Sequence, residues 1–306
     1  MYTCECISTS YTIRAVVAGA GALAAGTAGA VGLSYAAARD VPLSPLHGDG
    51  SIGADWADRR GLRGDAVAGE VESLDVYARP GFDPEGVHPA VRALYERTSE
   101  FRMTLDATWH RPFRLGARLA TRWTSRVEQL NLPGPGGEPK RLDSELAELA
   151  THAAVEDPRE DPRLWLRTDA ETGEGVFTAV YASHCRDGGA AEGAPDDRTG
   201  SGGERFVNVA VPLPGASLAT VLRIAHLGDG LELTTDCPAG GLYLHLDAGA
   251  FRLPASQRFR VAPARDPTVP APPDGVDRYD ADVLADQRIR LFGLPLVTVR
   301  YAATRV

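Results

Sequence analysis

The sequence predicts an α+β protein that is mainly antiparallel β, a sandwich or a partly closed barrel with a few helices, preceded by an N-terminal apolar helix. Strict alternation of apolar and polar residues over 101–109 is typical of a strand with one buried face. After residue 150, short apolar segments recur between Gly, Pro and Asp turns, without the alternating helices that a parallel sheet would need. Residues 15–38 contain no charged side chain, which predicts the apolar helix.

The N-terminal region divides into a tail, residues 1–14, and the apolar segment 15–38, which is long enough to span a bilayer as one helix. The segment is rich in Ala and Gly, so it inserts weakly, but a single membrane span is favoured. A cleaved signal peptide is a second interpretation, because Ala36-Ala37-Ala38 resembles a small-residue cleavage site. A dinucleotide-binding turn at Gly19-Ala20-Gly21 is disfavoured, because the segment that follows contains two prolines and suits a central strand badly.

Arginine placement bears on the orientation of that span. Arg14 precedes the apolar segment, whereas Arg39, Arg59, Arg60 and Arg63 follow it. Because basic residues near a span tend to stay in the cytoplasm, we expect a single-pass membrane protein whose folded part lies on the cytoplasmic side.

Residues 39–62 are rich in Gly, Asp and Pro and predict a linker, and residues 63–306 predict a single β-rich domain. Four helices are expected within that domain, at 64–78, 89–99, 112–127 and 142–150. The first rests on apolar residues at spacings of three and four, and the second on Pro89, since proline suits a first helical turn.

Nine later segments are expected to be strands, because they are short, apolar and bounded by turn residues. They are Leu164–Leu166, Val176–Ser183, Phe206–Val211, Leu231–Thr235, Leu242–Leu246, Phe251–Leu253, Arg258–Val261, Gln287–Phe292 and Leu296–Tyr301.

The composition argues against some classes of function. The formal net charge is -9, whereas a nucleic-acid binder would carry a basic surplus, so no nucleic-acid partner is expected. Lys140 is the only lysine, so nearly all basic residues are arginine. Four cysteines are too few for a disulfide scaffold in a chain of this length, and Cys185 and Cys237 would pair only outside the cell.

One basic pattern stands out in this acidic chain. Arg114, Arg118, Arg122 and Arg126 recur every four residues in the helix expected at 112–127, so they share one face. Such a face could contact anionic lipid headgroups or a phosphorylated ligand. The alternative is an ordinary surface helix that packs Leu119 and Trp123 on the sheet and exposes its arginines to water or to acidic neighbours.

No catalytic motif is present. The sequence has no G-x-S-x-G elbow, no P-loop and no pair of histidines with zinc-site spacing, so neither a metal nor a cofactor is expected. His110, His184, Asp236 and His245 lie near the ends of expected strands. An active site would require at least two of them to converge in one pocket.

Three stretches resemble an uncharacterised family of microbial proteins of unknown function. They are HPAVRALYERTSEF from His88, with Thr108-Trp109 after it, SRVEQLNLPGPG from Ser125, and RLFGLPLVTVRYA from Arg290. The resemblance implies no activity and no site residues.

These observations predict a membrane-tethered β-rich domain that binds a lipid, an apolar ligand or a protein partner without catalysis. The alternative is an enzyme with an unrecognised active site in the β-rich domain.

Overall fold

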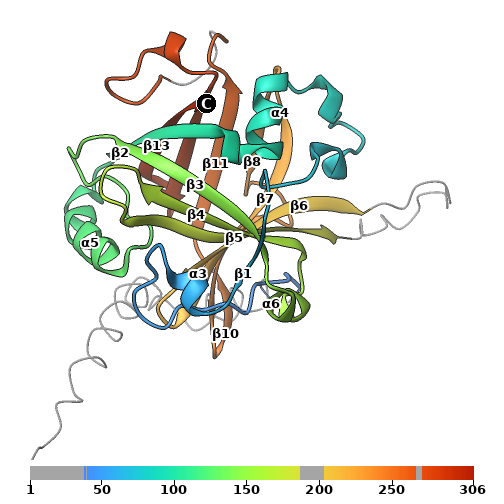
Figure 1. Ribbon diagram of the computed structural model, residues 1–306, viewed down its shortest axis with the longest axis vertical. Coiled ribbons are helices and arrows are strands. Elements are labelled where there is room, and N and C mark those ends of the chain that lie inside the picture. The colour runs from blue at the N-terminus through green and yellow to red at the C-terminus, as the bar shows by residue number, and fades with distance from the viewer. Residues whose placement is uncertain (1–37, 39, 187–202, 267–270) are drawn as a thin grey trace, which may run out of the picture.

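The computed structural model describes residues 38, 40–186, 203–266 and 271–306 (Figure 1). Within these residues the chain forms thirteen strands, which belong to one sheet. The strands are β1 (Arg63–Ala66), β2 (Phe101–Trp109), β3 (Lys140–Leu149), β4 (Glu160–Asp169), β5 (Gly175–Arg186), β6 (Glu204–Leu213), β7 (Ala216–Leu227), β8 (Gly230–Thr234), β9 (Gly241–Leu246), β10 (Gly249–Arg252), β11 (Ala255–Pro263), β12 (Val283–Leu291) and β13 (Leu294–Arg305). The α-helices are α3 (Trp56–Arg59), α4 (Pro89–Glu96), α5 (Arg114–Val127) and α6 (Thr151–Glu156), and the short 3-10 helices are η1 (Leu74–Tyr77), η2 (Pro84–Gly86), η3 (Thr98–Glu100) and η4 (Arg278–Asp280).

Ten of the described strands form a closed ring of antiparallel neighbours. Their order is β7, β6, β5, β4, β3, β2, β13, β12, β11 and β8, and β8 pairs with β7 again. β2 and β13 lie far apart in the chain, and their register runs from Val297 opposite Trp109 to Arg305 opposite Phe101. The prediction of mainly antiparallel β structure is therefore confirmed, but the barrel is closed, whereas the sequence suggested a sandwich or a partly closed barrel.

β7 is shared between two neighbours on the same side. Residues 216–221 pair with β9, and residues 223–227 pair with β8. The β9–β10 hairpin therefore leaves the ring, and it projects at the bottom of Figure 1.

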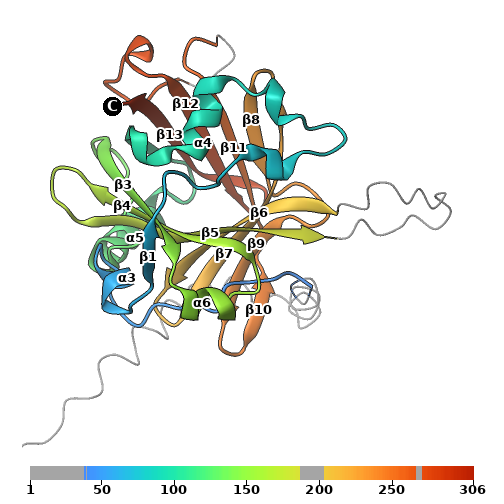
Figure 2. The same ribbon diagram turned by 45° about the vertical axis from the view of Figure 1, so that its right-hand side comes forward.

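The barrel interior and one covering segment make a single apolar core. The interior contribution includes Met103 and Leu105 from β2 and Val299 from β13. Residues 71–95 add Leu74, Tyr77, Phe82, Val91, Leu94 and Tyr95 to the same cluster. Figure 2 shows α4 beside β11 and β12, with which it is in contact.

Residues 40–62, which lie within the predicted linker 39–62, pack on the outside of the barrel. Ile52 and Trp56 are fully buried there against Leu164 and Val180, the outward-facing residues of β4 and β5. The Gly- and Asp-rich composition suggested a free segment, but Leu43, Ala57 and Leu62 are buried as well, so the segment packs along much of its length.

Two predicted helices are wrong. Residues 142–150 belong mainly to β3, which buries both its faces: Leu142 points into the barrel, and Ala147 and Leu149 join the outer cluster. Burial on both faces produced an apolar spacing that looked helical. Residues 64–78 form β1, a bend and the 3-10 helix η1 instead of an α-helix.

The bend in that segment has a steric cause. Gly69 lies against the end of α4, where a Cβ atom would come within 2.4 Å of the Tyr95 carbonyl oxygen. The backbone N–H of Glu70 donates to the same carbonyl at 2.8 Å. At this point the backbone therefore hydrogen-bonds to α4 and does not continue into a helix of its own. The other two expected helices are present, as α4 followed by η3 and as α5.

The apolar segment 15–38 lies, except for Ala38, outside the described residues, so the structure does not confirm the N-terminal helix. Among the helices that the structure describes, none is both long and apolar enough to cross a bilayer.

Candidate functional site

A polar cluster lies within the apolar interior of the barrel, and we call it the interior cluster. Its members come from five separate parts of the chain, and all are buried except Tyr301, which is half-buried. They are Glu70 and Tyr77 from residues 70–77, Tyr95 from α4, Arg167 from β4, Tyr181 from β5 and Tyr301 from β13. These groups affect one another's pKa through their charges, so they form one electrostatic unit.

Arg167 is the unusual member. Its guanidinium carbon lies 4.0 Å from the ring centre of Trp165 and 5.9 Å from that of Tyr301. Because β3 and β2 separate β4 from β13 in the ring, contact with Tyr301 places the guanidinium inside the barrel. Arg167 is 6% exposed, makes neither a hydrogen bond nor an ion pair with any described residue, and its buried Nε has no acceptor.

The pKa of Glu70 is shifted toward neutral pH. Burial raises the pKa of Glu70 to about 7, and the positive charge of Arg167 opposes that rise. No carboxylate oxygen of Glu70 lies within ion-pair distance of Arg167. Near neutral pH a large fraction of Glu70 is therefore protonated, and the interior then holds an uncompensated cation.

The buried tyrosine hydroxyls of the cluster are poorly satisfied. The hydroxyl of Tyr95 is buried without a hydrogen-bond partner among the described residues, and those of Tyr77 and Tyr181 interact only with each other, in a weak hydrogen bond. Burial raises the pKa of all three, so they stay neutral donors. Tyr301, by contrast, donates to Gln287 Oε1 at 2.9 Å.

A small cavity of about 40 Å³ adjoins this cluster. Glu70, Tyr77 and Tyr181 line it, together with Arg163 and the exposed Glu72 and Asp161. The interior cluster is therefore connected to the surface by a space that holds a few water molecules or one small polar group.

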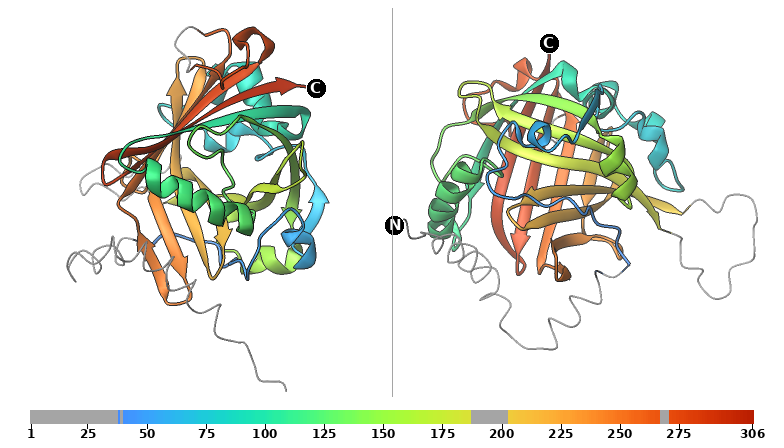
Figure 3. Two further views of the ribbon diagram at one scale, coloured as in Figure 1. Left: turned by 90° about the vertical axis from the view of Figure 1, so that its left-hand side faces the viewer. Right: turned by 60° about the horizontal axis from the view of Figure 1, so that its bottom comes forward.

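The arginines predicted on one face of α5 do share an exposed face. Arg114, Arg118, Arg122 and Arg126 are all exposed, and none has an acidic or hydrogen-bond partner among the described residues. Trp123 packs on the outer cluster as expected, but Leu119 does not: it is 70% exposed, and Leu115 is 74% exposed. At 100° per residue, Leu115 falls within the arc of the four arginines, and Leu119 lies about 20° beyond it. In Figure 3, α5 crosses in front of the strands in the left view and lies to one side of them in the right view.

A larger hollow of about 210 Å³ lies beside the start of α5. Arg114 and Trp109 line it, together with Asp106, Asp274 and Arg300. Arg300 is paired with both of these aspartates, at 2.8 Å from Asp274, so Arg114 is the unpaired cation of this hollow.

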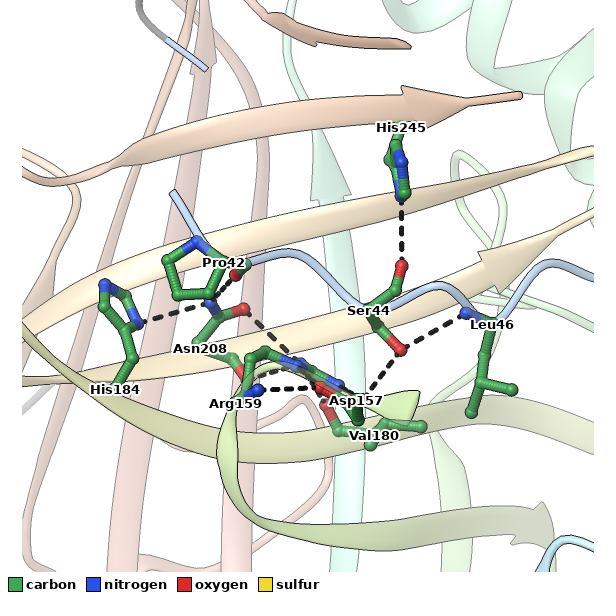
Figure 4. A network of polar contacts seen from close by, with 9 residues as sticks. All are labelled: Pro42, Ser44, Leu46, Asp157, Arg159, Val180, His184, Asn208 and His245. Carbon is green, nitrogen blue, oxygen red and sulfur yellow. Dashed lines mark hydrogen bonds and ion pairs between the residues drawn. The ribbon is translucent and has the colours of Figure 1, made fainter. Parts of the chain in front are cut away.

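A second buried polar network, shown in Figure 4, holds the segment 42–46 on the barrel. Its centre is an ion pair with fully buried side chains, in which Arg159 donates to the carboxylate of Asp157 at 2.7 and 2.8 Å. Arg159 also donates to the backbone oxygens of Val180 and Asn208, at 3.2 and 3.0 Å. We call this network the segment clamp.

Three contacts attach the segment itself. The Ser44 hydroxyl donates to Asp157 at 3.0 Å, the Asn208 amide donates to the Pro42 oxygen at 2.7 Å, and His245 Nδ1 donates to the Ser44 backbone oxygen at 3.0 Å. Asn208 also contacts His184 Nδ1 at 3.3 Å. Burial, followed by the charge of Arg159, lowers the pKa of His184 to about 4, so its ring is neutral near pH 7.

Of the four candidate catalytic residues, His184 and His245 thus join the same network, but through different partners. His245 bonds the Ser44 backbone and not its hydroxyl, so no serine–histidine pair exists here. His110 bonds Thr298 elsewhere, at 2.9 Å, and Asp236 is exposed after β8. The segment clamp satisfies backbone groups, which is a structural role. Cys185 and Cys237, both described, are free thiols.

Sequence reasoning missed the interior cluster because its members are scattered over the chain. One local signal was available: Trp165 lies between Leu164 and Leu166, so both faces of the strand are apolar there, and Arg167 follows on the Trp165 face. Such an arginine must be buried, and buried arginine requires a partner.

The fold and its polar centre define a closed antiparallel β-barrel with a buried, unpaired arginine and an external basic helix. No protein-family model and no solved structure matches the chain. The chain is similar to the uncharacterized membrane protein YndJ of Bacillus subtilis (strain 168), with 27% identity over 270 residues. The match covers 86% of this chain but 43% of the relative, so the chain spans less than half of that protein. This similarity confirms the expected resemblance to uncharacterised microbial proteins.

Proposed function

We propose that the chain is a membrane-associated, non-catalytic β-barrel that binds an anionic lipid surface through α5. The observation that carries this proposal is the exposed face of α5, where four unpaired arginines lie next to two exposed leucines. Like charges four residues apart repel one another, so acidic partners on neighbouring elements would be favourable, yet none of the four arginines has one among the described residues.

The free energies expected for these arginine and leucine side chains favour lipid binding. Each arginine near an anionic membrane contributes about 1 kcal/mol. Full burial of a leucine side chain contributes about 1.5–3 kcal/mol, so even partial insertion of Leu115 and Leu119 adds to the four arginines. An amphipathic helix of this kind lies in the headgroup region, with its basic side chains at the phosphates.

Two further observations support a membrane location. Residues 15–38 are uncharged and long enough to tether the barrel in a single pass, and the relative's printed name is that of a membrane protein. The basic residues that follow this segment favour the cytoplasmic side, where anionic lipids give the leaflet a negative potential. A tether together with a basic face is a pair of signals that yields stable attachment.

Hydrogen exchange in vesicles tests the docking of α5 separately from the tether. The full chain is reconstituted into vesicles of phosphatidylcholine alone, or with phosphatidylglycerol added, and exchange is measured in peptides that cover Arg114–Val127. We expect slower exchange only in the anionic vesicles, and the effect should weaken as salt is raised.

The matched variants separate local docking from net charge. Changing Arg114, Arg118, Arg122 and Arg126 to Gln should abolish the protection. Changing four exposed arginines elsewhere, Arg97, Arg102, Arg265 and Arg290, removes the same charge and should leave it intact. Equal protection in neutral and anionic vesicles, or equal loss in both variants, would disprove docking through α5.

A further inference from the structure

The charged side chains around the cavity of about 40 Å³ are mostly acidic. Three of them are the acids Glu70, Glu72 and Asp161, and one is the base Arg163. Arg163 donates to the Gly69 carbonyl oxygen at 2.9 Å, and no ion pair joins it to any of these three acids. The lining therefore carries an excess of negative charge and favours a cation.

Glu70 has no partner within the described part of the chain. It is 6% exposed, and its carboxylate neither accepts a hydrogen bond nor forms an ion pair there. A buried carboxylate without a donor is costly. Its oxygens are not sealed within the protein, as the Nε of Arg167 is, so they reach the cavity that Glu70 lines. A donor group in the cavity would satisfy this carboxylate.

The aromatic part of the lining suits a small organic cation. Tyr77 and Tyr181 line the cavity, and aromatic rings stabilise cations that lie against them. Burial raises the pKa of Tyr77, and the charges of Glu70 and Asp161 add to that rise, so both acids lie near this tyrosine. A cation in the cavity thus meets aromatic rings and carboxylates together.

We propose that this cavity binds a primary ammonium group, which donates to the Glu70 carboxylate and lies against the rings of Tyr77 and Tyr181. An ammonium is a compact charge with three donors, so it satisfies Glu70 and keeps donors for water or Asp161. A metal ion is the poorer fit, because the described residues contain no group of three His, Cys, Asp or Glu side chains placed to ligate one. This site is independent of lipid docking by α5.

Arg167 is compatible with a second cation nearby, because it does not line the cavity. Its positive charge favours the ionised form of Glu70, and a bound ammonium does the same. Binding therefore converts a carboxyl that is partly protonated near pH 7 into a carboxylate that compensates both cations, and a proton is released. The other charged or titratable groups around Glu70 are Glu72, Tyr77, Tyr95, Asp161, Arg163, Tyr181 and Arg205.

The size of the cavity limits the enclosed part of the ligand to an amino group and its first carbon atoms. A longer molecule extends outside, where Val76 is 44% exposed beside the cavity and offers an apolar surface. The ligand is therefore either a free small amine or the amino end of a longer apolar molecule.

Isothermal calorimetry with the full chain tests the proposal. Methylammonium is the small probe, hexylammonium is the long-chain probe, and tetramethylammonium, which has no N–H donor, is the reference cation at equal ionic strength. We expect saturable binding of a primary ammonium but not of the reference. Equal affinity for both primary ammonium ions identifies a free amine, and tighter binding of hexylammonium identifies the amino end of a longer molecule.

The same titration measures the proton that binding displaces. At pH 7 it is repeated in phosphate and in MOPS, two buffers that differ in ionisation enthalpy. Because the pKa of Glu70 is about 7, the heats should report the release of about half a proton for each ammonium bound.

Glu70→Gln should weaken binding about tenfold or more, because a hydrogen bond to a charged group contributes that much, and should abolish the proton release. Glu138→Gln removes an exposed acid that does not line the cavity, and it should change neither quantity. Glu72→Gln combined with Asp161→Asn keeps the test decisive if Glu70→Gln fails to fold. Both side chains are exposed, Asn tolerates the left-handed backbone of Asp161, and binding should weaken several-fold.

The ammonium site does not exist if neither primary ammonium binds the unaltered chain more tightly than tetramethylammonium does. Binding without proton release would overturn the role of Glu70. Equal affinity for the unaltered chain and for either Glu70→Gln or the double variant would overturn the proposal as well.

Discussion

Replacement of Glu70 by glutamine should change how the stability of the protein depends on pH. Burial raises the pKa of Glu70 from 4.5 to about 7. A carboxyl whose pKa is raised in the folded state stabilises the fold at low pH, and this stability is lost as pH rises from 4.5 through about 7. Each pKa unit corresponds to 1.36 kcal/mol, so the loss between pH 5 and pH 8 is about 2 to 3 kcal/mol.

Urea unfolding followed by tryptophan fluorescence measures this effect. The free energy of unfolding of the unaltered chain is compared with that of Glu70→Gln at pH 5 and at pH 8. Other groups also titrate in this range: the lowered pKa of His184 produces the opposite slope. The difference between the two proteins cancels such shared contributions.

The expected result is that Glu70→Gln gains about 2 to 3 kcal/mol relative to the unaltered chain between pH 5 and pH 8. A buried amide without partners lowers stability at every pH, so only this difference is diagnostic. Glu72→Gln is the control, because Glu72 is exposed two residues away, and it should gain nothing. If Glu70→Gln and the unaltered chain lose stability in parallel from pH 5 to pH 8, the argument from burial is wrong.

Three further outcomes follow from the segment clamp and from α5. Asp157→Ala leaves Arg159 as a buried, unpaired cation, so the free energy of unfolding in urea should fall by about 3–5 kcal/mol, whereas Asp58→Ala, at an exposed ion pair, should cost about 1 kcal/mol or less. His184→Asn should make the stability of the fold less sensitive to acid. The lowered pKa of His184 gives stability that is present above pH 6.5 and is lost as pH falls toward 4. Thermal midpoints at pH 4.5 and 7 measure this, and a difference between them equal to that of the unaltered chain would contradict it. Leu115→Ser with Leu119→Ser should leave the thermal midpoint nearly unchanged, because both side chains are exposed, while weakening attachment of α5 to anionic vesicles; a large fall in the midpoint would show that they pack in the fold.

The strands with one buried face could be predicted, and those with two could not. β2 alternates over its whole length, and its sequence showed this directly. β3 buries Leu142 on one face and Leu149 on the other, so its apolar residues fall at a helical spacing. β7 is missing from the expected strands altogether, because most of its residues are buried and it has no simple alternation.

The arginine face of α5 and the interior cluster also differ in how far they could be predicted from the sequence. The arginines of α5 follow a local period of four, so their shared face could be predicted from one stretch of sequence. The interior cluster joins Glu70, Arg167 and Tyr301 across the barrel, and only the ring order of the strands brings them together. The exposure of Leu119 could not be predicted either, because it depends on how far α5 stands from the sheet.

The pairing of β2 with β13 has a consequence for biosynthesis. The strands from β2 to β8 can pair in turn as they leave the ribosome, since each lies next to its predecessor in the ring. One edge of β2 (Phe101–Trp109) has no partner strand until β13 (Leu294–Arg305) has been translated. Until then the nascent sheet has an open edge that invites pairing with other chains. A ribosome stalled before codon 294 should therefore carry an aggregation-prone open sheet that lacks only the closing strand β13, and chaperones would have to shield it.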